Sequence, residues 1–308
     1  MKQKHLLSLK DYSRAEIEEI HELARKVKAD KAAYRDRLTG KSLGMIFQKP
    51  STRTRVSFEV GMSQLGGTAL FLGADTIQLH RGETIADTAK VLSRYVDGIM
   101  ARVFAHQDVL DLARHGTVPV INGLSDLLHP CQALSDYFTL RERRGRLEGL
   151  KIAYVGDGNN VCHELMFGAV KLGMAMSVAS PAGYQPNQLI VKSAARDAQK
   201  ARTPLPVVVE DPMEAVAGAD VVYTDVWTSM GQEAEAEARR RAFAGFMVTP
   251  EMMDAASREA VFMHCLPAHR GEEVAAQVID GPRSVVFDEA ENRLHVQKAV
   301  LLLLLGGG

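Results

Sequence analysis

The sequence predicts an α/β protein with two domains, each a parallel sheet flanked by helices. Its length of 308 residues exceeds the usual size of a single domain. Short apolar runs alternate with amphipathic stretches along the chain, which is typical of βαβ units whose sheet is covered on both faces. A polar, basic stretch at 141–151 interrupts this alternation, and the pattern begins again after it. The two sheets are therefore expected to be joined near residues 143–150.

The elements can be predicted in order from the apolar periodicity. A capping box, Ser13 with Glu16 three residues later, marks the start of the first helix. In the first half, strands are expected at 43–47, 68–72, 97–101 and 118–122, with helices near 53–65, 83–94, 106–114 and 131–143. In the second half, strands are expected at 151–157, 175–180, 206–210, 220–225, 260–265 and 284–288, with helices near 160–172 and 187–200. The last helix is expected from about Glu289 to Leu305.

Composition and charge exclude several kinds of partner. A formal net charge of -1 gives no reason to expect a nucleic acid or a membrane surface. The three cysteines are scattered and odd in number, which argues against a disulfide framework and favours a reducing compartment. The N-terminal segment lacks the apolar run of a signal peptide, and the apolar C-terminal tail is too short to span a bilayer. We therefore expect a cytoplasmic protein.

An anion site is predicted where the stretch KPSTRTRVSFEVG follows the first strand. Ser51, Thr52, Arg53 and Thr54 lie at the N-terminus of the next helix, where free backbone N–H groups and the helix dipole favour an anion. Hydroxyl donors and the planar fork of arginine strengthen such a site. A capped helix with surface arginines would explain Ser51 but not the remaining donors. The glycines and the lysine of a Walker loop are missing.

Other strand ends carry matching groups. Arg102 follows the third strand, and His129 and Gln132 begin the helix after the fourth. A lone histidine is more often a capping or buried residue than a catalytic one. However, the carboxyl ends of parallel strands are where α/β sheets bind ligands, and three of them here offer a partner for an anion or a carbonyl group.

The second half lacks the signals of a cofactor or a metal. The stretch YVGDGNNVCHE is similar to a dinucleotide-binding turn, but Val161 stands in place of the third glycine, so no nicotinamide cofactor is expected. Cys162 beside His163, and His264 beside Cys265, lack the spacing of zinc motifs, and neighbours on a strand point to opposite faces. We expect neither a cofactor nor a metal.

The motifs S-T-R-T-R, H-P-C-Q, D-V-W-T-S-M-G and H-C-L-P, in this order and spacing, closely resemble those of the ornithine carbamoyltransferases. The resemblance covers essentially the whole chain. The first two motifs also occur in aspartate and putrescine carbamoyltransferases, whereas S-M-G together with H-C-L-P is the ornithine-type signature. The resemblance implies transfer of the carbamoyl group from carbamoyl phosphate to the side-chain amine of L-ornithine, giving L-citrulline and phosphate.

The resemblance also implies an arrangement of domains and subunits. It implies a carbamoyl phosphate-binding domain over 1–145, with the C-terminal helix 289–308 packed back on it, and an ornithine-binding domain over 146–288. It further implies homotrimers, or multiples of them, with active sites near the subunit interfaces.

Carried over by motif, the resemblance implies two sets of ligand-binding residues. Those for carbamoyl phosphate are Ser51, Thr52, Arg53, Thr54, Gln78 from a neighbouring subunit, Arg102, His129, Gln132, Cys265, Leu266 and Arg293. Those for ornithine are Asn160, Asp225, Ser229 and Met230, with Asn159 as the alternative to Asn160. The predicted catalytic residues are Arg102, His129 and Cys265.

The chemistry of the reaction is consistent with these residues. The carbonyl oxygen gains negative charge when the amine attacks, and Arg102, His129 and Thr54 can act as a clamp for it. An ornithine ammonium with a pKa near 10.4 must first lose a proton. Desolvation lowers that pKa, and Cys265 or Asp225 can accept the proton. The alternative for Cys265 is an inert buried thiol, the usual state of a free cysteine.

The segment from Asp225 to Arg241 is expected to close over ornithine after carbamoyl phosphate has bound, with Gly231 as a flexible point. Its i,i+4 pairs, Glu235 with Arg239 and Glu237 with Arg241, contribute only about 0.2–0.5 kcal/mol each. A rigid surface helix is the alternative. Two other functions are open: a carbamoyltransferase for another amine or amino acid, and a non-catalytic sensor of a phosphate ligand. Intact clamp and acceptor residues argue against the sensor.

Overall fold

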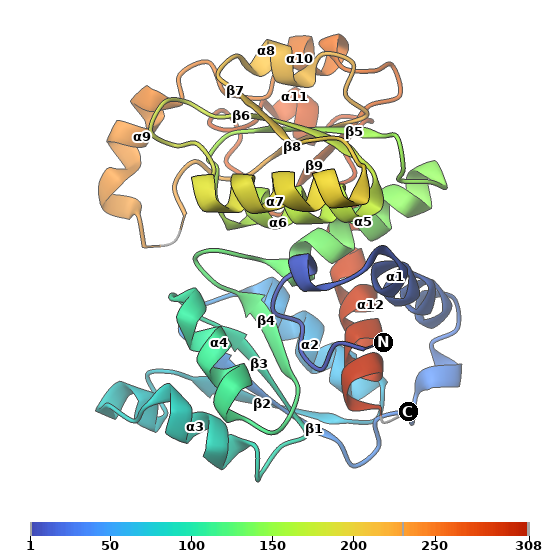
Figure 1. Cartoon of the computed structure of the whole chain (residues 1–308), viewed down its shortest axis with the longest axis vertical. Helices are drawn as coiled ribbons and strands as arrows, with labels where there is room; N and C mark the ends of the chain where they lie inside the picture. The colour runs from blue at the N-terminus through green and yellow to red at the C-terminus, as the bar shows by residue number, and fades with distance from the viewer. Residues whose placement is uncertain (1, 230, 307–308) are drawn as a thin grey trace. The chain divides into compact units, whose positions relative to one another are not determined.

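The computed structural model describes residues 2–229 and 231–306. The chain divides into two compact units. The first comprises Met1–Phe138 with Glu291–Gly308, and the second comprises Thr139–Ala290. Helices α5 (Pro130–Arg144) and α12 (Val286–Leu305) each contribute residues to both units. Each unit contains one sheet, as Figure 1 shows.

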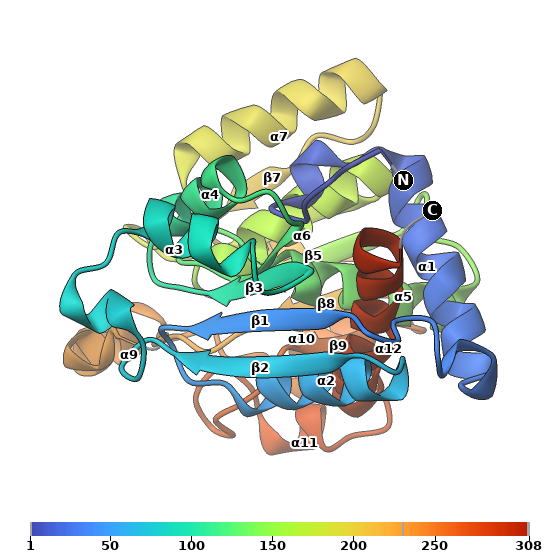
Figure 2. The same ribbon diagram turned by 90° about the horizontal axis from the view of Figure 1, so that it is seen from below.

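The first unit is a four-stranded parallel sheet with the order β2-β1-β3-β4. The strands are β1 (Ser42–Phe47), β2 (Thr68–Gly73), β3 (Gly98–Arg102) and β4 (Val120–Leu124). The helices are α1 (Arg14–Ala29), α2 (Thr52–Gln64), α3 (Ile85–Leu92) and α4 (His106–His115), with short 3-10 turns η1 (Leu9–Asp11), η2 (Ala32–Tyr34) and η3 (Gln78–Arg81). Helices α3 and α4 cover one face and α2 the other (Figure 2). The strand β1 reads as an almost continuous apolar run because both of its faces are buried.

The second unit is a five-stranded parallel sheet with the order β7-β6-β5-β8-β9. The strands are β5 (Lys151–Val155), β6 (Ala175–Ala179), β7 (Val207–Val209), β8 (Val221–Thr224) and β9 (Val261–His264). The helices are α6 (Asn160–Leu172), α7 (Gln188–Ala201), α8 (Pro212–Val216), α9 (Ala236–Ala242), α10 (Pro250–Ala255) and α11 (Ala276–Ile279), with the turn η4 (Glu233–Glu235) before α9. Helices α6 and α7 lie on one face, and α8, α10 and α11 on the other (Figure 1).

The predicted fold class is confirmed, with two parallel sheets flanked by helices and the end of α12 packed in the first unit. The predicted capping box is also present, since Glu16 N donates to Ser13 Oγ at 3.3 Å and Ser13 N donates to Glu16 Oε2 at 3.0 Å. None of the helices in the described part of the chain has the length and apolar character needed to span a bilayer.

One predicted strand is wrong. Residues 284–288 form no strand: Ser284 makes only an isolated bridge to Phe262, and α12 already begins at Val286. A short apolar run such as SVVFD is compatible with either a strand or the first turn of a buried helix, and periodicity cannot separate the two. The short helices α8, α10 and α11 also have no counterpart among the predicted elements.

Each sheet has a topological switch point, and the candidate site residues cluster there. In the first unit β1 and β3 are neighbours in the sheet. The chain leaves β1 toward β2 on one side, and it leaves β3 toward β4 on the opposite side. In the second unit the same holds for β5 and β8. Loops that leave neighbouring strands in opposite directions open a crevice at the carboxyl edge of the sheet. The carboxyl edge of each sheet is therefore a candidate ligand site.

Candidate functional site

The first unit places a capped helix N-terminus beside the end of β3. Ser51 is the N-cap of α2, and Thr54 N donates to its Oγ at 3.2 Å. Thr52 and Arg53 form the first turn of this helix, and Arg102 is the last residue of β3. These predicted anion-binding residues therefore lie at or just after the carboxyl ends of β1 and β3, the two strands of the switch point.

A buried arginine ties three helices of this unit together. Arg293, on α12, donates through Nη1 to Gln132 Oε1 at 2.5 Å and through Nη2 to Thr54 Oγ1 at 3.3 Å. Gln132 in turn donates to Asp136 Oδ1 at 2.8 Å. The predicted residues of α2, α5 and α12 are thus brought together by direct hydrogen bonds. Arg293 positions Thr54 and Gln132 in addition to supplying positive charge.

His129 lies within this positively charged cluster as a neutral imidazole. Burial lowers the pKa of His129 well below its usual value, and the charges of Arg293, Arg102 and Arg53 lower it further. Its Nδ1 is buried and makes no hydrogen bond within the described part of the chain. A neutral histidine can donate one hydrogen bond to a carbonyl oxygen. Unlike a protonated histidine, it does so without the cost of burying another charge.

Lys49, the first residue of the K-P-S-T-R-T-R stretch, belongs to the same cluster, although no role was predicted for it. Burial lowers the pKa of Lys49, the charge of Arg102 lowers it further, and Asp126 opposes both. Its ammonium lies 4.5 Å from the centre of the Phe104 ring. Its position two residues before Ser51, the N-cap of the predicted phosphate-binding helix, was the available signal. A lysine among arginines is suited to a ligand that carries more than one negative charge.

The structure places Gln78 differently from the rest of this set. Gln78 is exposed and begins η3, on the connection that follows β2. Strand β2 is an edge strand of its sheet. An exposed side chain beyond an edge strand is accessible to a second molecule.

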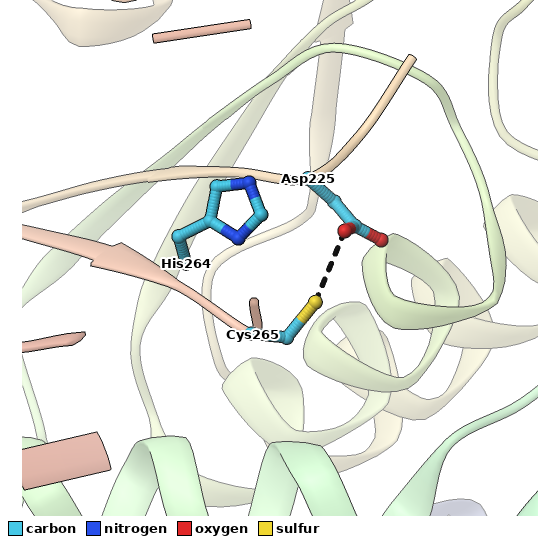
Figure 3. Close-up of side chains that lie close together, drawn as sticks. All are labelled: Asp225, His264 and Cys265. Carbon is cyan, nitrogen blue, oxygen red and sulfur yellow. Dashed lines mark hydrogen bonds between the residues drawn. The ribbon is translucent and has the colours of Figure 1, made fainter. Parts of the chain in front are cut away.

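The second unit gathers three strand ends around one carboxylate. Asp225 directly follows β8, Cys265 directly follows β9, and Asn159 lies in the loop after β5. Cys265 Sγ donates to Asp225 Oδ1 at 3.0 Å, and Asn159 Nδ2 donates to Asp225 Oδ2 at 2.7 Å. Val226 N also donates to Oδ1, at 2.8 Å. Figure 3 shows the thiol pointing at the carboxylate, with the ring of His264 beside them.

The two neighbouring asparagines have different structural positions. Asn159 is the N-cap of α6, and its Oδ1 accepts from Val161 N at 3.0 Å and Cys162 N at 3.2 Å while its Nδ2 is held by Asp225. Its amide is therefore committed to the fold. Asn160 is the first residue of α6 and is half-buried. Asn160 thus stays the predicted ligand.

The glycines of G-D-G-N-N serve close packing of the backbone. A Cβ on Gly158 would lie 2.2 Å from the backbone nitrogen of Pro186, and Gly156 has a φ of 140°. This requirement explains the similarity of the stretch to a dinucleotide-binding turn.

The backbone at Leu266 is strained and is held by its neighbours. Leu266 has a φ of 58°, which a leucine rarely adopts. Leu266 N donates to His264 Nδ1 at 2.8 Å, and His264 Nε2 lies 3.3 Å from Glu273 Oε1. The backbone N–H of His264 donates to Glu289 Oε2 at 3.0 Å. These bonds fix the turn that presents Cys265.

Asp225, His264 and Cys265 offer ligand atoms within 4.8 Å of one another, a set that could hold a metal ion. However, the Nδ1 of His264 accepts from Leu266 and its Nε2 faces Glu273. Both ring nitrogens are therefore in use, and a metal would have to break one of these bonds. The donor set does not fit a metal centre.

The last two predicted residues follow β8. Ser229 is half-buried, and its backbone N–H donates to Gln232 Oε1 at 3.2 Å. Met230 lies outside the described residues. The segment that carries both residues leads into α9 through η4.

Comparisons with known proteins cover nearly the whole chain. The family "Aspartate/ornithine carbamoyltransferase, carbamoyl-P binding domain" matches residues 4–142, and "Aspartate/ornithine carbamoyltransferase, Asp/Orn binding domain" matches 148–304. A relative from Symbiobacterium thermophilum called ornithine carbamoyltransferase is 62% identical over 307 residues, covering 99% of each chain. One of that name from Thermococcus kodakarensis is 59% identical and covers 98% of this chain and 96% of the relative. The solved structure of ornithine carbamoyltransferase from Pyrococcus furiosus has a TM-score of 0.94 at 57% identity, covering 99% of this chain and 97% of that one.

We predict that Arg53→Lys weakens the binding of inorganic phosphate roughly tenfold or more, because lysine cannot form paired bonds to two oxygens of one anion. Isothermal titration with phosphate measures the Kd, and thermal melting checks the fold. Arg55→Lys is the matched control, since Arg55 is 47% exposed and pairs with Glu59 at 2.9 Å. Equal phosphate affinity in the two variants would contradict a site at Arg53.

Proposed function

The chain belongs to the aspartate/ornithine carbamoyltransferase family, and on that premise we propose that it transfers the carbamoyl group of carbamoyl phosphate to the side-chain amine of L-ornithine, giving L-citrulline and phosphate. The observation that carries the proposal is the Asp225–Cys265 hydrogen bond of 3.0 Å, which joins the two ornithine-type motifs at one carboxylate. Relatives that are similar over the full length carry the name of this activity.

The first unit is the proposed site of carbamoyl phosphate. Thr52 and Arg53, at the N-terminus of α2, would hold the phosphate, which leaves as a dianion. Arg102 and the neutral imidazole of His129 would hold the carbonyl oxygen as it gains charge. Gln132, fixed by Arg293, would bind the carbamoyl amide. The cluster supports this assignment because most of its charged groups are positive.

The second unit is the proposed site of ornithine. Asn160 and Ser229, with Met230, would bind the α-amino and carboxylate groups. Asp225 would receive the surplus proton of the amine. As the new C–N bond forms, the bond from carbon to the phosphate oxygen breaks, and the phosphate leaves with the electron pair. The leaving phosphate would take the second proton of the former ammonium, which makes it the dianion. Cys265 would contact the reacting amine from the H-C-L-P turn.

The three cysteines support a location in the cytoplasm. In the described part of the chain Cys131, Cys162 and Cys265 form no disulfide, and the first two are buried. Cysteines that stay as thiols are typical of proteins that work in a reducing compartment. We therefore propose that the enzyme acts there.

An exposed apolar face on the first unit supports assembly into homotrimers. This apolar face consists of Val56 and Val60, one turn apart on α2, with Phe71 on the edge strand β2, which are 49%, 37% and 42% exposed. The centre of the Phe71 ring lies 3.9 Å from the guanidinium carbon of Arg55 on α2. Exposed apolar residues that lie near one another mark interaction sites, and a cyclic trimer buries the same face in every subunit. Gln78 follows β2 along the chain, so it would be delivered to a neighbouring subunit's phosphate site.

The proposed activity is tested by citrulline formation. We expect citrulline from carbamoyl phosphate and L-ornithine, and no transfer to aspartate or putrescine, because Asn160 and Ser229 would select an α-amino acid with a side-chain amine. A colorimetric assay of citrulline with each acceptor measures this. Faster transfer to another amine would establish the alternative substrate, and phosphate binding without transfer to any acceptor would establish a sensor.

We predict that Asp225→Asn raises the KM for ornithine at least about tenfold and leaves carbamoyl phosphate binding nearly unchanged, because Asp225 belongs to the second unit. Steady-state kinetics with each substrate varied in turn measures both constants. Equal weakening of both substrates would contradict this division between the units.

Closure of the segment after Asp225 is tested by hydrogen exchange. We expect exchange at residues 226–229 and 231–241 to slow only when an ornithine analogue joins carbamoyl phosphate, because ornithine is the ligand that this segment would cover. Carbamoyl phosphate alone is the control. Identical exchange in the free and doubly liganded protein would refute closure.

A shared active site predicts complementation between two inactive variants. Gln78→Ala and Arg102→Ala would each abolish most activity, since each removes one partner of every site. In co-expressed mixed trimers a site regains both residues when Arg102 of one subunit meets Gln78 of the next. Random mixing should therefore restore about a quarter of wild-type activity. Mixtures no more active than the separate variants would refute sharing.

A further inference from the structure

A buried arginine of α9 joins two of the loops that surround Asp225. Arg239 is 6% exposed. Its Nη1 donates to Asp157 Oδ2 at 3.1 Å and to the backbone carbonyl of Trp227 at 2.9 Å. Its Nε donates to Glu235 Oε2 at 3.0 Å, and its guanidinium lies 4.9 Å from the centre of the Tyr184 ring. The pair with Glu235, expected from the sequence to be a weak surface pair, is thus buried at its arginine end.

The two groups that this guanidinium holds lie next to the proposed ornithine ligands. Asp157 lies in the loop after β5, three residues before Asn160, the first residue of α6. Trp227 lies midway between Asp225 and Ser229 in the loop after β8. Both contacts use one nitrogen atom, so the distance between the two loops is limited by a single planar group. A buried charge of this kind is stable only while its partners stay in place.

Packing and hydrogen bonding have separable roles in this region. Trp227 stacks on Phe243, with ring centres 5.5 Å apart, and Phe243 also contacts Phe246 and Tyr184. This apolar cluster anchors α9 and the preceding segment to the core of the second unit. Arg239 contributes polar interactions instead. Its hydrogen bonds to Asp157 and Trp227 fix the positions of the loops after β5 and β8. Loss of its charge should therefore disturb the ligand-binding loops more than the fold.

We propose that Arg239 is a positioning residue for the amino-acid substrate. It fixes the spacing between the loop after β5 and the loop after β8, so that Asn160 and Ser229 converge on one ligand while Asp225 faces its amine. The inference rests on the proposed function, because ornithine is the ligand that these loops would hold.

The carboxylate of Asp157, which pairs with Arg239, makes the spacing of the two loops sensitive to pH. Burial raises the pKa of Asp157 to about 6, against the attraction of Arg239, and Asp225 and Glu235 raise it further. Tyr154 and Cys162 also face this carboxylate, and both are neutral because burial raises their pKa values well above the usual ones. Asp157 is mostly charged only above its pKa, so acidification below pH 6 replaces the ion pair by a weaker hydrogen bond between the Arg239 guanidinium and a neutral carboxyl group.

The first test separates positioning from folding. Arg239→Met should raise the KM for ornithine roughly tenfold or more, with an unchanged KM for carbamoyl phosphate, because small misplacements of a binding group are costly. Arg239→Lys should recover part of the affinity, since it keeps the charge but not the fork. Arg241→Met is the matched control, because Arg241 lies on the same helix and is 79% exposed. Thermal melting of all three verifies folding.

The second test uses pH. The ratio of the ornithine KM of Asp157→Asn to that of the wild type should be large at pH 7.5 and approach one at pH 5, where the wild-type carboxyl is also neutral. The ratio cancels the titration of ornithine itself. A ratio that does not change with pH would overturn the inference, as would Arg239 variants with wild-type ornithine KM or with equal loss of both substrates. A wild-type protein that forms no citrulline would refute the proposed function instead.

Discussion

The carboxylate of Asp225 is the point on which the second unit's site depends. Burying a carboxylate is costly unless donors surround it, and here the donors come from three directions: the Asn159 amide, the Cys265 thiol and the backbone of Val226. Each donor belongs to a different loop or strand end, so satisfying one charge brings the ends of β5, β8 and β9 together. Arg239 repeats this arrangement at the neighbouring Asp157.

The first unit solves the opposite problem, since it must keep several positive charges close together before an anion arrives. The α2 N-terminus, Arg102 and Lys49 repel one another, and the lowered pKa values of Lys49 and His129 record that repulsion together with burial. Arg293 is held by Gln132 and Thr54, so its charge is fixed before the ligand binds. Such a preorganised cluster gives up little conformational freedom on binding.

The sequence predicted most of the fold because buried parallel strands appear as short apolar runs and amphipathic helices as a repeat of about 3.6 residues. It predicted candidate site residues because side chains that follow parallel strands lie together at the carboxyl edge of a sheet. Residues 284–288 were assigned wrongly since the apolar start of α12 has the composition of a strand. Arg239 and Lys49 were not identified as parts of the sites because nothing in a charged stretch shows which arginine or lysine is buried. The structural position of Asn159 likewise became visible only with the Asp225 contact.

The direction of the Cys265–Asp225 hydrogen bond bears on which of the two accepts the proton of the amine. The thiol is the donor and the carboxylate the acceptor. Ionising the thiol would place two negative charges 3.0 Å apart, which raises the cost of a thiolate. The carboxylate needs no such ionisation, and its lone pairs are already oriented by Asn159 and Val226. We therefore propose Asp225 as the acceptor, with Cys265 as a weak donor that would yield its place on Oδ1 to the incoming ammonium.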